Sequence, residues 1–471
     1  AELKTNTKMF CGCKNDPDEE KPNVNICPVC MAHPGALPVL NKKAIENVIK
    51  VGLAIGGEVA NFSEFDRKNY FYPDIPKGYQ ISQYKCPIVS GGYLADMNVT
   101  RIHLEEDTAN NKHDRGDFSL IDFNRAGVPL MELVTEPHTF ENAEEAAEKA
   151  AKFAKELQLI LWYLGVSEAN MEKGEMRVEA NISISTDQKI LGTKVEIKNL
   201  NSFRSVERAI KFEIERMTKL LEEGKSSEIA QETRGWDESK QKTFSQRKKE
   251  SSEDYRYFPD PDLPKMKLHE AFDLEKMKKK LLGLPEAKRA RYKKDFRIKD
   301  EYVEVFINKP ELSEWFEKEV VPKFVDKKDL VIAANFIVND LQGFIQTRFV
   351  EGTTRLPNAL KFSKIVQMYI QGKITSRGAK DMLGHFATNL DFFDEEPEEF
   401  AKLEGMLQES NTDALKEIAQ KIIEANPKTI ADYKAGKENA IMSLVGQIMK
   451  DTNGSANPQM VKQLLIDLLT Q

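Results

Sequence analysis

The amino-acid sequence predicts an α+β fold, in which a first region of mixed strands and helices is followed by a mostly helical region. Residues 34–135 alternate short strand-like runs with turn residues, as in GGYLADMNVTRIHL and FSLIDF. Beyond Pro264 the chain changes to long Lys/Glu-rich amphipathic segments with few β-branched runs. Because 471 residues exceed what one hydrophobic core usually organises, we expect two or three domains.

Two helices are expected to pack on the strands of the first region. Residues 142–164 place apolar side chains on one face at helical spacing, with Asn142 as a cap and Gly165 as a stop. Residues 202–223 predict a second amphipathic helix that ends at Gly224. Strand alternation resumes between them, in MRVEANISIS and KVEIKNL. Helices packed on strands in this way are typical of the α+β class.

The helical half is expected to contain a middle domain and a small C-terminal module. Turn residues interrupt its helices at Asn426-Pro427, Gly454-Ser455 and Asn457-Pro458. Clusters of lysine and arginine, at 278–280 and 288–294, lie in stretches that otherwise look like surface helix. We interpret these clusters as solvated helix faces.

Charge and hydropathy limit the classes of partner. The net charge is -7 at pH 7, so the chain is not a polycation that coats nucleic acid, and any RNA contact must be local. No apolar run approaches the roughly 20 residues of a membrane-spanning helix. The opening residues AELKTNTKMF lack the features of a secretory signal or a transit peptide, so we expect a cytoplasmic protein without membrane contact.

Four of the five cysteines stand in two close pairs. Cys11 and Cys13 form CGC, and Cys27 and Cys30 form CPVC after a polar loop. Two thiolates on each of two turns match a tetrahedral four-cysteine zinc site. Disulfides are the alternative, which a cytosolic context disfavours. Since four protein thiolates leave no open coordination position, the zinc is predicted to be structural.

Sequence motifs for several kinds of catalysis are absent, namely GxxxxGK[ST], HExxH, GxSxG and GxGxxG. What remains is carboxylates within strand-like runs. Glu105, Glu106 and Asp107 follow RIHL, where alternation sends Glu106 to the opposite face from the other two. Glu132 lies in VPLMELV and Glu179 in MRVEANISIS. Taken singly, each carboxylate is favoured to be a solvent-facing residue, because burying it unpaired is costly.

Residues 65–83, FDRKNYFYPDIPKGYQISQ, concentrate five aromatic rings, three basic residues and two prolines. The rings and prolines predict a rigid wall that positions the ammonium groups of Lys68 and Lys77. A packed corner with surface lysines is the alternative interpretation.

Several blocks in a fixed order together resemble the B subunit family of the tRNA-dependent amidotransferase GatCAB, nearly end to end. They are CGC…NICPVCMAHPGALPVLNKKAIE, FDRKNYFYPDIPKGYQISQY, RIHLEED, DFNRAGVPLMELVTEP, MRVEANISI, GTKVEIKNLNSFRSVERAI, QETRGWDE, EDYRYFPDPDLP and GKENAIMSLVGQIMK…ANPQMVKQLL. The resemblance implies a cradle-like catalytic domain at 1–265, a helical domain at 266–395, and a YqeY-like tail at 396–471 that holds tRNA.

The resemblance also implies an ATP-dependent carbon–nitrogen ligase. In the family, the side-chain carboxylate of misacylated Glu-tRNA(Gln) or Asp-tRNA(Asn) is phosphorylated with ATP, and ammonia then displaces phosphate to give the amide. Phosphorylation precedes amidation because a free carboxylate resists attack by an amine, whereas an acyl phosphate offers a good leaving group. Ammonia comes from glutamine hydrolysis in the A subunit, so the A and C subunits and the misacylated tRNA are the expected partners. The sequence does not choose between the two tRNAs.

Site residues follow from the matching positions. Glu106 and Glu132 fall on the family's Mg²⁺-ligand positions, and hard carboxylate oxygens suit that ion. Glu105 and Glu179 fall on acidic positions beside it.

The aromatic stretch acquires a role from the same resemblance. Lys68 and Lys77 fall along an ammonia tunnel, in which Tyr72, together with Tyr70 and Tyr79, supplies walls and hydroxyl partners.

The sequence departs from the family pattern in three places. A first strand reading close to VIGLEVHVEL, with a metal-binding residue, is expected before Ala1. The usual EEDAG reads EEDTAN here, and the position that is often aspartate is Glu179.

Two alternative functions stay open from the sequence. The first is a non-catalytic, tRNA-binding scaffold within the same complex, against which the retained acidic and basic motif residues speak. The second is a zinc-dependent hydrolase, which fails if all four thiolates fill the coordination of the metal.

Overall fold

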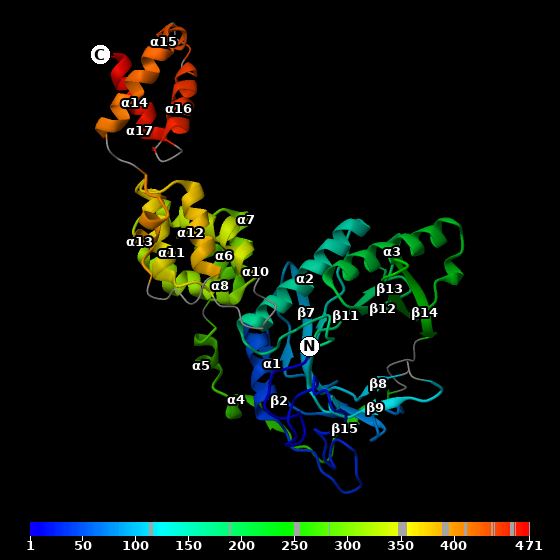
Figure 1. Ribbon diagram of the computed structural model, residues 1–471. Coiled ribbons are helices and arrows are strands. Elements are labelled where there is room, and N and C mark those ends of the chain that lie inside the picture. The colour runs from blue at the N-terminus through cyan, green and yellow to red at the C-terminus, as the bar shows by residue number, and fades with distance from the viewer. Residues whose placement is uncertain are drawn as a thin grey trace. The chain divides into compact units, whose positions relative to one another are not determined.

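The computed structural model describes residues 1–112, 116–187, 190–248, 255–281, 283–346, 356–388, 395–408, 412–434, 437, 439–452, 456 and 458–470. The chain forms two compact units, Ala1–Pro285 and Glu286–Gln471 (Figure 1). The finer division into three domains, with boundaries at 265 and 395, stays a prediction.

The first unit contains an antiparallel sheet whose longest strand carries RIHLEE. Its strands follow the order β1-β5-β7-β10, and β6 pairs with β7. Their bounds are β1 Glu58–Val59, β5 Val89–Ser90, β6 Tyr93–Leu94, β7 Met97–Glu106 and β10 Pro129–Thr135. In the register of β7 and β10, Glu132 lies opposite His103 and Leu130 lies opposite Glu105.

Three smaller sheets join distant parts of the first unit. The order β15-β3-β4 brings the chain near residue 258 against the strand at 66–69, and β16 pairs with β2 and β8 with β9. Their bounds are β2 Phe62–Ser63, β3 Asp66–Asn69, β4 Tyr79–Ser82, β8 Asn110–Lys112, β9 Leu120–Asp122, β15 Phe258–Pro259 and β16 Met266–Lys267.

The second large sheet has the order β11-β12-β13-β14, with β12 and β13 parallel. Its strands are β11 Val178–Ile182, β12 Val195–Leu200, β13 Glu232–Asp237 and β14 Lys242–Lys248. Helices α2, Ala143–Tyr163, and α3, Phe203–Glu222, run side by side above it (Figure 1). Short helical segments at Ser226–Glu228, α4 Leu268–Ala271 and α5 Leu274–Lys279 complete the unit.

Both predicted helices of this region are confirmed, together with their ends. The side chain of Asn142 accepts a hydrogen bond from the Glu145 N–H at 2.9 Å, so it caps α2. Gly165 and Gly224 follow α2 and α3 with φ of 62° and 71°, a left-handed conformation that glycine adopts without steric cost.

The prediction of strand-like structure throughout 34–135 is wrong at one place, because residues Lys42–Ala54 form helix α1. Asn41 caps this helix by accepting hydrogen bonds from the N–H groups of Lys43 and Ala44. Ile45, Val48 and Ile49 are buried along one face, which gives the helix its packing surface.

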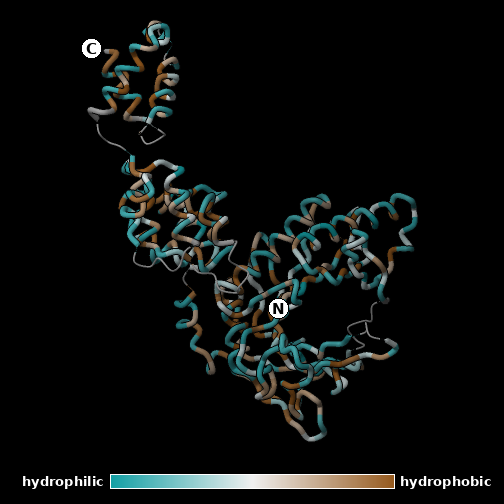
Figure 2. Tube along the Cα trace, in the orientation of Figure 1, coloured by the Kyte–Doolittle hydropathy of each residue, from teal (hydrophilic) through white to brown (hydrophobic). Residues whose placement is uncertain are grey.

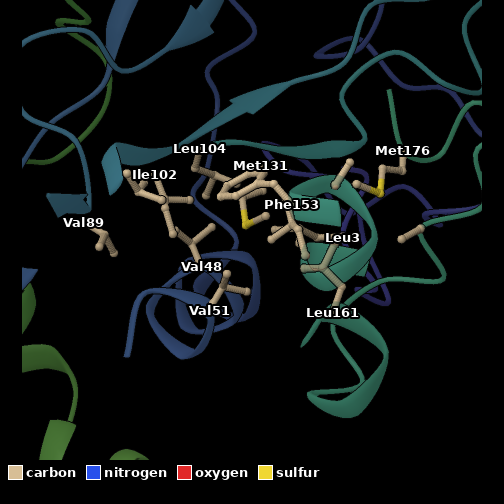
Figure 3. Packing of buried hydrophobic residues seen from close by; sticks show 14 of the residues in the cluster. Leu3, Val48, Val51, Val89, Ile102, Leu104, Met131, Phe153, Leu161 and Met176 are labelled. Carbon is tan, nitrogen blue, oxygen red and sulfur yellow. The ribbon is translucent and has the colours of Figure 1, made fainter. Parts of the chain in front are cut away.

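The core of the first unit lies between α1, α2 and the first sheet. Figure 3 shows Val48 and Val51 of α1 directed toward Val89 of β5 and Ile102 of β7. Met131 of β10 lies in the same layer. Burial on this side fixes the register of β7 and β10, and therefore the position of the polar side chains on the other face of these strands.

The second unit is helical in its described residues, as the sequence predicts. Its helices are α6 Pro285–Lys294, α7 Asp300–Ile307, α8 Pro310–Trp315, α9 Lys327–Phe336, α10 Gln342–Gln346, α11 Ala359–Ile370, α12 Ser376–Thr388, α13 Pro397–Leu403, α14 Thr412–Ala425, α15 Pro427–Lys434, α16 Ala440–Asp451 and α17 Pro458–Thr470. Short helical stretches at Phe316–Val320, Val321–Lys323 and Ile337–Leu341 lie among them.

Helices α14 to α17 share a small core of their own, which includes Leu415, Leu444 and Leu465. Figure 2 shows hydrophilic and hydrophobic residues alternating along these helices, as amphipathic packing requires. Asn426-Pro427 separates α14 from α15, which confirms that predicted interruption. The predicted turn at Gly454-Ser455, and Asn457, lie outside the described residues. Within the described part of the chain, no helix combines the length and the apolar character needed to cross a membrane.

Candidate active site and metal centre

The register of β7 and β10 brings three possible metal ligands together. His103 lies opposite Glu132, and Glu105 follows His103 by two residues on the same strand face. One ligand atom from each side chain lies within 4.8 Å of the other two, and we call these three residues the acidic cluster. His103 and Glu105 are buried, whereas the Glu132 side chain is 47% exposed, so the acidic cluster is open to solvent on the β10 side.

Burial sets the protonation of the acidic cluster. It raises the pKa of Glu105 to about 7, with the charge of Glu132 adding to the effect and Lys68 opposing it. It lowers the pKa of His103 to about 4, so the imidazole is neutral at neutral pH. The buried Nδ1 of His103 has no hydrogen-bond partner within the described chain. A neutral imidazole and two carboxylates form a donor set for a divalent cation.

Glu106 is directed elsewhere. Its carboxylate pairs with the Lys77 ammonium and accepts a hydrogen bond from the Ile81 N–H at 2.9 Å. Glu106 is not part of the acidic cluster. The role of Glu106 as a magnesium ligand therefore stays a prediction, and its carboxylate already neutralises a half-buried lysine.

Glu179 lies on β11 and is exposed. Its carboxylate accepts a hydrogen bond from Lys198 of β12 at 2.8 Å. Glu179 is likewise outside the acidic cluster, and its role as an acidic residue beside the magnesium site stays a prediction.

Lys68 is a cation that, like Arg101, acts on the acidic cluster. Its charge lowers the pKa of both Glu105 and His103, which places the ammonium within electrostatic range of them. The Nζ atom lies 5.0 Å from the ring centroid of Tyr255 and 5.9 Å from that of Tyr70. The two rings contact each other, with centroids 6.2 Å apart, and together they attract the cation.

The remaining predicted tunnel residues lie around Lys68 and Lys77. Tyr72 is 53% exposed, and its ring centroid lies 6.1 Å from that of Tyr70. Tyr70 is half-buried, and partial removal from water raises the pKa of its hydroxyl. The Arg67 guanidinium covers the Tyr79 ring at 4.3 Å. The structure therefore provides a tyrosine-rich wall, while its function as a tunnel stays a prediction.

The sequence analysis missed His103 and the tyrosines near residue 255. His103 could have been found from RIHLEED, because it precedes Glu105 by two residues and shares its strand face. Tyr255 and Tyr257 stand in EDYRYF, and only the pairing of β15 with β3 brings them to this place.

The four predicted zinc ligands do come together. The Sγ atom of Cys30 lies 3.4 Å from that of Cys11 and 3.7 Å from those of Cys13 and Cys27. Sulfurs at the corners of a zinc tetrahedron are about 3.8 Å apart, because each Zn–S bond is about 2.3 Å. A disulfide needs about 2.0 Å, and all five cysteines are free. The cluster thus has the size of a four-cysteine metal site and not of two disulfides.

A buried lysine lies against the cysteine cluster. The Nζ of Lys8 lies 3.7 Å from the Cys30 sulfur and donates hydrogen bonds to the carbonyls of Asn25 at 2.8 Å and Phe123 at 2.9 Å. A hydrogen bond from the Cys11 thiol, with the Lys8 charge, lowers the pKa of Cys30 to about 4. The ammonium therefore joins the cysteine loop to the segment that precedes β10.

Comparison with known proteins identifies the family. Residues 1–273 match a family model described as the GatB/GatE catalytic domain, and residues 314–469 match one described as the GatB domain. The class of protein is thus an N-terminal catalytic domain joined to a helical GatB domain. The chain belongs to the GatB family.

Similar proteins cover nearly the whole chain. Each of the following is described as the B subunit of an aspartyl/glutamyl-tRNA(Asn/Gln) amidotransferase. The relative from Carboxydothermus hydrogenoformans is 40% identical over 483 residues, covering 100% of this chain and 97% of that relative. The relative from Thermotoga petrophila is 39% identical over 99% of this chain and 97% of its own length. The relative from Synechocystis sp. is 39% identical over 100% of this chain and 96% of its own length.

Proposed function

We propose that this chain is the B subunit of an ATP-dependent amidotransferase that converts Glu-tRNA(Gln), Asp-tRNA(Asn) or both to the amidated forms. The observation that carries the proposal is the acidic cluster of His103, Glu105 and Glu132, with Lys68 beside it, inside the domain that matches the GatB/GatE catalytic model. Phosphoryl transfer to a carboxylate needs such a site, because two anions must approach each other.

The residues of the acidic cluster fit a divalent cation of the Mg²⁺ class. Glu105 and Glu132 would hold it with carboxylate oxygens, and His103 would add its unpartnered ring nitrogen. Glu106 remains a candidate ligand if Lys77 releases it. A cation bound there would offset negative charge between ATP and the substrate carboxylate.

Two lysines would have separate roles, one in binding the substrate and the other in lining the ammonia path. The Lys68 ammonium, which lies near the rings of Tyr70 and Tyr255, would bind the substrate carboxylate or its acyl phosphate next to Glu105. Lys77 would line the ammonia path with Tyr72, while Glu106 holds it in place. Glu179, on the second sheet, would add a negative charge for binding of cations or ammonium.

The other parts of the chain complete the assembly. Zn²⁺ held by Cys11, Cys13, Cys27 and Cys30 would be structural, since four thiolates leave no position for substrate. We propose A and C subunits as partners in a cytoplasmic heterotrimer, with the A subunit supplying ammonia from glutamine. The helical domain at 266–395 would connect the cradle at 1–265 to a tRNA-holding tail at 396–471.

A non-catalytic tRNA-binding scaffold of the same complex is the second candidate. It gives no physical reason for a buried histidine and a buried carboxylate with strongly shifted pKa values, which cost stability unless they bind something.

The test is amide formation on Glu-tRNA(Gln) and on Asp-tRNA(Asn), with ATP, magnesium and ammonium chloride, by this chain assembled with A and C subunits. Exogenous ammonia bypasses the glutaminase. We expect Glu132→Ala to lower the rate by at least about 100-fold, because a metal-binding carboxylate is lost. Glu136→Ala is the matched control, an exposed glutamate just after β10. Amide formation that survives Glu132→Ala would favour the scaffold function.

A further inference from the structure

Outside the acidic cluster, the first unit carries a pair of stacked tyrosines, one of which is exposed. The rings of Tyr84 and Tyr257 are nearly parallel, with centroids 4.4 Å apart and an angle of 11° between their planes. Tyr84 is 51% exposed although it follows the buried strand β4. A large ring left half in solvent and backed by a second ring is a surface prepared for another flat group.

Both tyrosines are anchored to the same strand, β3. The buried Asp66 accepts hydrogen bonds from the backbone N–H of Tyr84 at 2.8 Å and of Lys85 at 3.3 Å. On the other side, β15 pairs with β3 directly after Tyr257, and Arg67 binds Asp260 at 2.8 Å. The two rings come from segments far apart in sequence, and each backbone is fixed independently of the stack.

The backbone before Tyr257 is held in an unusual conformation. Arg256 has φ of 44°, which a residue with a side chain rarely adopts. The Asn69 amide stabilises it by donating to the carbonyls of Tyr255 at 3.1 Å and Arg256 at 2.9 Å. Strain of this kind persists where the surrounding contacts determine a position, and here the strained residue lies between Tyr255 and Tyr257 in the sequence.

The stacked pair lies beside the acidic cluster. The charges of Glu105 and Glu132 act on the Tyr257 hydroxyl and, after burial, contribute to the rise of its pKa. The Tyr255 ring lies 6.1 Å from that of Tyr257 and also contacts the Lys68 ammonium. The rings of Tyr84, Tyr257 and Tyr255 therefore form a series that ends near the Lys68 ammonium. Ser82, two residues before Tyr84, donates a hydrogen bond to the Glu105 carboxylate at 3.0 Å.

We propose that the Tyr84–Tyr257 pair is a stacking platform for the adenine ring of a substrate whose reactive group reaches the acidic cluster. The proposal rests on the proposed function, which brings adenine from two sources, ATP and the 3′-terminal adenosine of the aminoacylated tRNA. A base can stack on a tyrosine ring because every base has a π face. Lys85, which is exposed and adjacent to Tyr84, is available for a phosphate attached to the adenosine.

The experiment measures binding directly in the complex assembled with A and C subunits. One arm titrates ATP with magnesium, and the other titrates tRNA with and without its terminal adenosine. We expect Tyr84→Ala to weaken binding of one adenine source by about tenfold or more, whereas Tyr84→Trp retains affinity because an aromatic ring remains. Tyr93→Ala is the matched control, since Tyr93 is also exposed, at 58%, and lies in β6, which pairs with β7 and not with β3 or β4.

The arms distinguish the source of the adenine. Loss confined to ATP identifies the nucleotide, and loss confined to tRNA that carries its terminal adenosine identifies the acceptor end. Unchanged affinity for both, or equal loss in Tyr84→Ala and Tyr93→Ala, overturns the platform. The binding test does not depend on turnover. If the complex without substitutions forms no amide, the proposed function is refuted, but the binding data still test the stacking platform.

Discussion

A single buried lysine links the cysteine cluster to the rest of the first unit. Lys8 is fully buried, and its ammonium contacts Cys30 and two carbonyls. Four thiolates around Zn²⁺ carry two excess negative charges, which a neighbouring cation offsets. We expect Lys8→Met to lower zinc affinity by about 10- to 100-fold, measured by transfer of zinc to a chromophoric chelator.

Two further variants serve as controls for the effect of Lys8→Met on zinc affinity. Cys27→Ser removes a ligand and should abolish stoichiometric zinc. Lys14→Met removes an exposed lysine close in sequence to Cys13 and should leave zinc affinity unchanged, because Lys14 pairs with Asp16 and not with a cysteine. Equal affinities for the Lys8 and Lys14 variants would show that charge compensation by Lys8 is unimportant.

Glu105 and Glu106 are neighbours with different environments, and substitution can separate their roles. Glu105 belongs to the acidic cluster, whereas Glu106 neutralises Lys77. We expect Glu105→Gln to weaken binding of Mn²⁺, used as a spectroscopic substitute for Mg²⁺, by at least about tenfold, since one carboxylate ligand is lost. Glu106→Gln should change it less than about threefold and instead lower the melting temperature, because Lys77 loses its partner. The reverse pattern would assign the metal to Glu106.

Among the elements, α1 depends on a close approach to the sheet. A Cβ on Gly52 would lie 2.8 Å from the Cγ1 of Val89, a buried residue of β5. We therefore expect Gly52→Ala to destabilise the chain by about 1–3 kcal/mol through overpacking, measured by urea unfolding. Gly446→Ala in α16 is the control, because no atom lies within 4 Å and the helix gains up to about 1 kcal/mol. If Gly52→Ala instead stabilised the chain, α1 would have to shift away from Val89 with no loss of stability.

How far the sequence predicts these elements depends on the range of the interactions that determine them. Helices α2 and α3 were predictable because their caps and stops, such as Asn142 and Gly224, are local. Helix α1 has an equally local cap in Asn41, but its apolar run lies among short strands and was interpreted as one of them. The four cysteines were found from spacing alone.

The composition of the acidic cluster required tertiary information. Alternation within RIHLEED separates Glu105 from Glu106, but only the register with β10 places His103 opposite Glu132. The diversion of Glu106 to Lys77 depends on the position of the loop before β4, which no local pattern determines. The stacking of Tyr84 on Tyr257 likewise depends on the pairing of β15 with β3, two strands that are far apart in the sequence.

At the scale of the whole molecule, the last helices are separable from the catalytic chemistry. Helices α14 to α17 bury Leu415, Leu444, Val461 and Leu465 in a core of their own, apart from the core that supports β7 and β10. A chain that ends at residue 408 should therefore keep its metal sites and its ATP binding. Its zinc content and ATP affinity are the controls that establish this.

We expect the same truncation to weaken tRNA binding by at least about tenfold, measured by filter binding of the complex assembled with A and C subunits. The net charge of -7 does not favour RNA over the whole surface, so affinity has to come from particular surfaces, and the GatB domain matched at 314–469 is proposed to supply one. A truncated chain with unchanged tRNA affinity would exclude the tail as a tRNA-holding module. Weaker tRNA binding together with unchanged ATP affinity would mean that helices α14 to α17 contribute to tRNA binding and not to ATP binding.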